Sequence, residues 1–124
     1  MVWQSDTVRR LLLAVAGVIG AVGVMAAATA SHGGSRNLAA VAAIALAHGP
    51  ALLALALAGR GRILMVAAIL LAAGTTGFVG DLAAREWLGH GLFPGAAPLG
   101  GIAMIGGWLA ITVAGLLGTR HRID

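Results

Sequence analysis

Residues 11–30 read LLLAVAGVIGAVGVMAAATA, a run of 20 residues without a charged side chain. A helix needs about 20 apolar residues to cross a hydrocarbon core that is about 30 Å thick. This run therefore predicts a membrane-spanning helix. Three further apolar runs follow, at residues 38–58, 63–82 and 98–117. The sequence thus predicts an all-α membrane protein in which residues 1–124 form a single domain with four spans.

The first apolar run has a second interpretation, as a secretory signal peptide. Arg9 and Arg10 precede it, and Ala28-Thr29-Ala30 at its end is similar to a small-residue cleavage site. The run is, however, longer than the roughly 7 to 15 apolar residues that are usual in such a signal. We therefore expect it to be a retained first span.

Composition and charge narrow the class of protein further. Hydrophobic residues make up 60% of the chain and charged residues 10%, against roughly a quarter charged in soluble domains. The basic residues are all Arg and are scattered singly or in pairs, whereas a nucleic-acid surface needs a contiguous basic stripe. The expected partner is therefore the lipid bilayer and not a nucleic acid. The absence of Cys excludes disulfides and Cys-ligated metal sites.

The positions of the arginines predict how the spans are oriented. Six of them lie in the N-terminal head, the second connection and the tail, namely Arg9, Arg10, Arg60, Arg62, Arg120 and Arg122. The first and third connections hold only Arg36 and Arg85. Because loops on the cytoplasmic side are enriched in basic residues, the distribution predicts antiparallel spans with both termini in the cytoplasm.

Small residues recur at spacings of three and four along the first, third and fourth runs. Such residues let helix backbones approach closely, so that van der Waals contact drives helix association in lipid. We therefore expect a compact antiparallel four-helix bundle. The residues expected at the helix contacts are Gly20, Gly23, Gly77, Gly80, Ala103 and Gly107.

Five blocks of sequence are similar to a known family. They are AAATASHGG (26–34), AHGPALLALAL (47–57), GFVGDLAAR (77–85), LFPGAAPLGG (92–101) and GWL (107–109). In this order and spacing they resemble the bacterial domain-of-unknown-function 423 family, small four-span inner-membrane proteins similar to animal transmembrane protein 256. The resemblance covers nearly the whole chain, although each block alone is weakly specific. It implies the four-helix architecture and a bacterial inner membrane, and it implies no established activity. Gly49-Pro50 departs from the family's pattern, because an apolar residue is expected there in place of proline.

His48 lies about half way along the second run, close to mid-bilayer depth at a rise of 1.5 Å per residue. An ionisable residue at that depth is by default a candidate functional residue. Pro50 has no amide hydrogen and leaves the Leu46 carbonyl without its usual helical partner. Thr75 and Thr76 lie at a similar depth in the third run. We therefore expect His48 to face the third helix and to form a hydrogen bond with one of these hydroxyls.

A second polar cluster is expected at the non-cytoplasmic end of the spans. Asp81 and Arg85 have the i, i+4 spacing that suits an ion pair. The whole cluster consists of His32, Arg36, Asp81, Arg85 and Glu86. It is expected to form a polar cap that joins the first and third connections, with an entry point for a proton or ligand as the alternative. A haem held by His32 and His48 is not expected, because these residues lie at different depths and axial ligation needs both imidazoles on one iron.

No enzyme is expected, since the sequence contains no paired catalytic carboxylates, no nucleophile elbow and no phosphate-binding glycine loop. No catalytic, cofactor-binding or metal-binding residue and no small-molecule substrate is therefore predicted. The function that we expect is a structural, accessory or assembly subunit that docks laterally on a larger complex of other membrane proteins. The alternative is a minimal proton or small-solute transporter or channel that uses His48, Thr75, Thr76 and Asp81.

Overall fold

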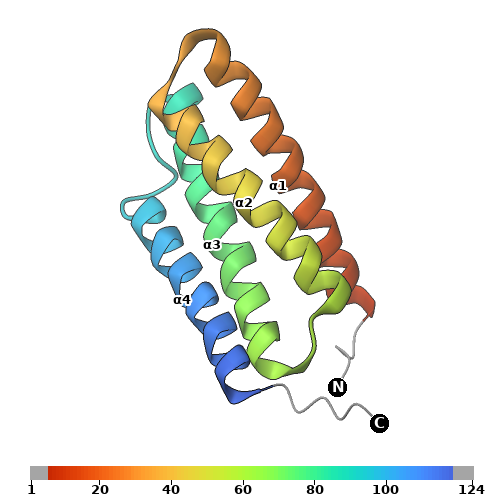
Figure 1. Cartoon of the computed structure of the whole chain (residues 1–124). Helices are drawn as coiled ribbons and strands as arrows, with labels where there is room; N and C mark the ends of the chain where they lie inside the picture. The colour runs from red at the N-terminus through yellow and green to blue at the C-terminus, as the bar shows by residue number, and fades with distance from the viewer. Residues whose placement is uncertain (1–5, 119–124) are drawn as a thin grey trace.

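The computed structural model describes residues 6–118, which form four α-helices (Figure 1). The helices are α1 (Asp6–Gly33), α2 (Arg36–Ala58), α3 (Gly61–Leu88) and α4 (Ala96–Leu117). Each is long and apolar enough to cross a membrane. The predicted all-helical class with four apolar helices is therefore confirmed for this part of the chain. Arg120 and Arg122, which entered the orientation prediction, lie outside the described residues.

The helix ends differ from the predicted runs most at the start of α1, which begins at Asp6 and not at residue 11, and at the end of α3. The run was predicted to end at residue 82, whereas the helix continues to Leu88 and stops at Gly89, whose φ of 80° is left-handed. Glycine adopts this conformation without the steric cost that a Cβ imposes. The Ser35 hydroxyl caps α2 by accepting a hydrogen bond from the Leu38 amide at 3.3 Å. The helices α1 and α2, and α2 and α3, are each linked by only two residues.

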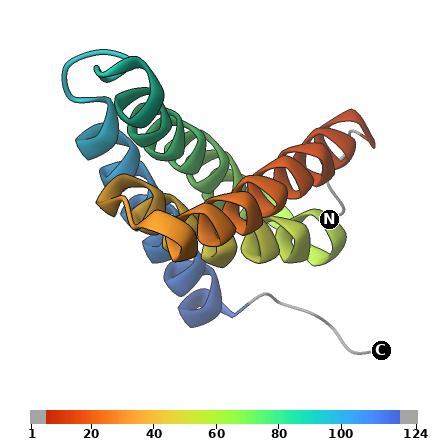
Figure 2. The same cartoon turned by 90° about the horizontal axis from the view of Figure 1, so that it is seen from above.

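The four helices pack as two pairs. In Figure 1, α1 lies along α2 and α3 lies along α4, and contacts between α2 and α3 join the pairs. The contact between α1 and α3 is marginal, and no Cα atom of α4 lies within 8 Å of one in α1 or α2. Figure 2 shows α1 diverging from α3 when the molecule is seen from above. The described helices therefore form a helical bundle that is open beside α1 and less compact than expected.

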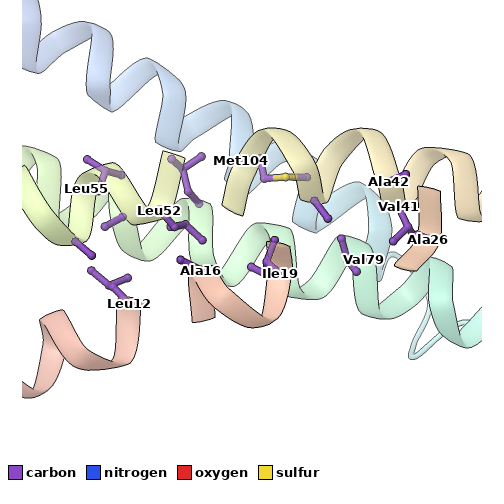
Figure 3. Packing of buried hydrophobic residues seen from close by; sticks show 14 of the residues in the cluster. Leu12, Ala16, Ile19, Ala26, Val41, Ala42, Leu52, Leu55, Val79 and Met104 are labelled. Carbon is purple, nitrogen blue, oxygen red and sulfur yellow. The ribbon is translucent and has the colours of Figure 1, made fainter. Parts of the chain in front are cut away.

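The core lies where α1, α2 and α3 meet and receives Met104 from α4 (Figure 3). Its largest fully buried apolar side chains are Leu52, Leu71 and Val41. Since lipid tails are as apolar as these side chains, shape complementarity between helices and not removal from water stabilises such a core.

Glycines bring the backbones of the paired helices into direct contact. A Cβ built on Gly49 would lie 3.1 Å from the Gly20 nitrogen, and one on Gly100 would lie 2.7 Å from the Gly74 carbonyl oxygen. Because backbone atoms cannot rotate away, a side chain at either position would push the helices apart.

Several residues that were expected at the helix contacts lie there. A Cβ on Gly23 would meet the Leu46 side chain at 2.9 Å, and one on Gly107 would meet Leu71 at 2.7 Å. Ala103 contacts the Gly74 position.

Gly77 and Gly80 are corrections to the expected contacts. A Cβ on Gly77 would meet nothing within 4 Å, and one on Gly80 would meet only the Leu92 side chain, from the α3–α4 connection. The reason is that α3 packs against both α2 and α4, so that a single stripe of small residues does not define its contact face. The close contact between α3 and α4 is formed instead by Gly74 of α3 and Gly100 of α4.

Candidate functional site

His48 is buried within α2, with 6% of its surface exposed, and both of its ring nitrogens are hydrogen-bonded. The indole Nε1–H of Trp108 in α4 donates to His48 Nε2 at 3.0 Å. An indole nitrogen is only a donor, so Nε2 must accept and the ring proton must lie on Nδ1. His48 Nδ1 lies 2.8 Å from the Ile44 carbonyl oxygen and donates to it. The geometry therefore describes a neutral imidazole in one tautomer.

The His48–Trp108 contact bridges two helices whose backbones are far apart. No Cα atom of α2 lies within 8 Å of one in α4, and two large side chains span the gap. Their rings form an edge-to-face pair with centroids 5.7 Å apart and planes at 72°, an arrangement that aromatic rings favour. Trp108 remains 42% exposed on the outer side.

The expected hydrogen bond from His48 to Thr75 or Thr76 is corrected by this geometry. Thr75 is fully buried, and its hydroxyl has no hydrogen-bond partner among the described residues. Thr76 is exposed and faces a groove between α1 and α3. His48 pairs with α4 instead, where Trp108 donates to it. The mid-span position of Trp108 was visible in the sequence, but its pairing with His48 depends on how α2 and α4 are placed.

Trp108→Phe is expected to lower the free energy of unfolding by about 1 kcal/mol, within the range of about 0.6 to 2 kcal/mol found for hydrogen bonds between membrane helices. Phe keeps an aromatic ring at this position, although a smaller one, and removes the donor to His48 Nε2. Thr75→Val is the matched control, since it removes a buried hydroxyl that has no partner and should be neutral or stabilising. Denaturation in detergent measures both. Equal destabilisation by the two variants would contradict the assigned hydrogen bond.

Asp81 connects the end of α3 to the α3–α4 connection. Its side chain is 0% exposed, and Oδ2 accepts from Arg85 Nε at 2.9 Å. Oδ1 accepts from the Leu92 amide at 2.8 Å. Gly91 lies so close to this carboxylate that a Cβ there would clash with Oδ1. The carboxylate therefore holds both its own helix and the following connection.

Of the other members of the predicted polar cap, Arg85 pairs with Asp81, whereas Glu86 and His32 form hydrogen bonds elsewhere. Glu86 Oε2 accepts from the Ser35 hydroxyl at 2.7 Å and so links α3 to the α1–α2 connection. His32 is exposed and its Nδ1 lies 2.9 Å from the Ala28 carbonyl oxygen of its own helix. Arg36 is exposed at the first position of α2. Ser35 was missed by sequence reasoning, because a loop serine has no signal that points to a partner 51 residues away.

The groove between α1 and α3 was also not predicted. It has a volume of about 700 Å³ and is lined by α1, α2 and α3. It exists because α1 and α3 barely touch, which no pattern within a single helix can indicate. The described residues contain no group of three or more His, Cys, Asp or Glu side chains that could hold a metal ion.

No family model matches the chain, and no curated protein or solved structure matches it. The geometry of the described residues is therefore the basis for assigning a function.

Proposed function

We propose that this protein is an accessory or assembly subunit that docks through α4 on a larger membrane complex. One observation supports this function above the others: α4 packs on α3 and leaves a continuous outer row of large apolar side chains. These side chains are 45 to 82% exposed and consist of Leu99, Ile102, Ile105, Leu109, Val113 and Leu116.

The position of α4 at the edge of the molecule favours another protein helix as the partner that covers this surface. The backbone of α4 packs against α3 only, which leaves lateral surface for another helix, and tight van der Waals contact drives helix association in lipid. The half-exposed Trp108 ring is held in place by its hydrogen bond to His48. Aromatic residues that are already ordered make strong interface anchors, because little side-chain entropy is lost on binding.

We further propose that the helices cross a bacterial inner membrane antiparallel to their neighbours, with both termini in the cytoplasm. Arg9 and Arg10 near the start of α1, and Arg60 and Arg62 beside the α2–α3 link, are exposed. Figure 1 draws the start of α1, the α2–α3 link and the end of α4 toward the same end of the molecule. The positive-inside rule assigns that end to the cytoplasm. Membership of the domain-of-unknown-function 423 family is a proposal that rests on the five sequence blocks.

The transporter alternative has no comparable support. A proton path through His48 needs a free ring nitrogen, whereas both are engaged by Ile44 and Trp108. The groove that Thr76 faces is lined mainly by apolar side chains, which do not favour the passage of water or ions. We therefore favour docking, with no catalytic step assigned to any residue.

Site-directed cross-linking tests the docking surface. The chain contains no Cys, so Ile105→Cys introduces a single reactive thiol on α4 at a position that is 62% exposed. Val24→Cys is the matched control on α1, at a position that is 61% exposed. With a maleimide photocrosslinker in native membranes, we expect Ile105→Cys to give one discrete protein adduct and Val24→Cys to give none. Identical adduct patterns, or no adduct from either variant, would refute docking through α4.

A further inference from the structure

The groove between α1 and α3 lies apart from the docking surface on α4, because it is lined by residues of α1, α2 and α3 only. Its α1 wall includes Val15, Val18, Val22 and Met25, and α2 contributes Leu38 and Val41. The α3 wall is made mainly of smaller residues, among them Gly80 and Ala83. Figure 2 shows the divergence of α1 from α3 that opens it. The result is an apolar groove along the side of the molecule that is open on its outer face.

The length of the groove matches one leaflet of a bilayer. On α3 the lining runs from Thr76 to Trp87, about 16 Å at 1.5 Å per residue. On α1 the lining is longer, from Ala14 to Thr29 or about 22 Å, so the two walls face each other only along the shorter α3 stretch. One leaflet contributes about half of a hydrocarbon core that is about 30 Å thick. A partner transmembrane helix would need the whole thickness, so the groove is too short to seat one along its length.

One end of the groove has the chemistry of the headgroup region. Trp87 lines this end and is 71% exposed, and Trp is enriched where membrane meets water. The Ser35–Glu86 hydrogen bond lies at the same end of α3. Arg36 is exposed two residues before Leu38, which lines the groove. A guanidinium there suits a phosphate group.

We propose that this groove binds one acyl chain of a membrane phospholipid, with the headgroup level with Trp87 and the chain running toward Thr76. An acyl chain with one polar terminus fits this groove best, because the walls are apolar, the length is that of one leaflet and one end is polar. This inference rests on the membrane location proposed above and is independent of docking through α4.

Filling the groove tests the proposal. Ala83→Phe places a large ring on the α3 wall, whereas Ala73→Phe places the same ring on an exposed position of α3 outside the groove. Native mass spectrometry of protein released from phospholipid nanodiscs measures the retained lipid. We expect the unaltered chain and Ala73→Phe to keep one phospholipid, and Ala83→Phe to keep it with about tenfold lower affinity. Equal retention by Ala83→Phe, or none by the unaltered chain, would overturn the site.

A measurement on the unaltered chain separates loss of binding from loss of folding. A phospholipid with a photoactivatable group in the middle of its acyl chain should label peptides with Val22 and Thr76 more than the peptide with Ile105, which is 62% exposed. Uniform labelling of all three would mean only general lipid contact and would overturn the proposal. Failure of the protein to enter nanodiscs would instead refute the membrane location. The cross-linking experiment on α4 tests docking and does not depend on whether the groove binds lipid.

Discussion

Gly100→Ala is expected to destabilise the protein by about 1–3 kcal/mol, the usual cost of overpacking a well-packed contact. The added Cβ would lie 2.7 Å from the Gly74 carbonyl oxygen and 2.8 Å from the Phe78 nitrogen. Both are backbone atoms of α3, so the clash can be relieved only by moving α4 away from α3. Among the described helices, only α3 has Cα atoms within 8 Å of α4, so that movement weakens the only backbone contact of α4.

Gly101→Ala is the matched control for this prediction, because the next residue along α4 faces open space. A Cβ on Gly101 would meet nothing within 4 Å, and Ala is the better helix former by up to about 1 kcal/mol. We therefore expect Gly101→Ala to be neutral or slightly stabilising. Unfolding of both variants in mixed micelles of sodium dodecyl sulfate measures the difference. Equal stability of the two variants would show that α3 and α4 are not in backbone contact at Gly74.

Asp81→Ala is expected to release the α3–α4 connection and to lower the unfolding midpoint more than Trp108→Phe does. The substitution removes the acceptor of the Leu92 amide and the partner of Arg85 at once. We expect amide hydrogen exchange at Leu92 to become roughly tenfold faster, since exchange reports local opening. Exchange at Leu71, in the core of α3, should change much less.

Asp81→Asn separates the two interactions of this carboxylate. The amide oxygen can still accept from Leu92, while the charge that attracts Arg85 is lost. Slow exchange at Leu92 should therefore be largely retained in Asp81→Asn, with an intermediate unfolding midpoint. If Asp81→Asn and Asp81→Ala behave alike, the bond to Leu92 depends on the ion pair with Arg85 that fixes the carboxylate within α3.

The apolar runs predicted the helices well because the membrane imposes a strong local rule. An uncharged run such as residues 11–30 must satisfy its backbone hydrogen bonds internally, and a helix does so. The end of α3 was harder to predict, because residues 83–88 are polar enough to leave the hydrocarbon and still favour helix until Gly89 ends it. The i, i+4 spacing of Asp81 and Arg85 predicted an ion pair for the same local reason, and the two residues form one.

The sequence by itself determined that residues 6–118 form four apolar helices, because helix length and composition depend on neighbouring residues only. Tertiary structure alone decided that His48 meets Trp108 and not Thr75, that Gly74 meets Gly100, and that a groove lies between α1 and α3. Ala and Gly occupy so many helix faces that several packings satisfy the pattern almost equally. Which faces meet depends on the fit of whole helices to one another, and no single stretch of the chain contains that information.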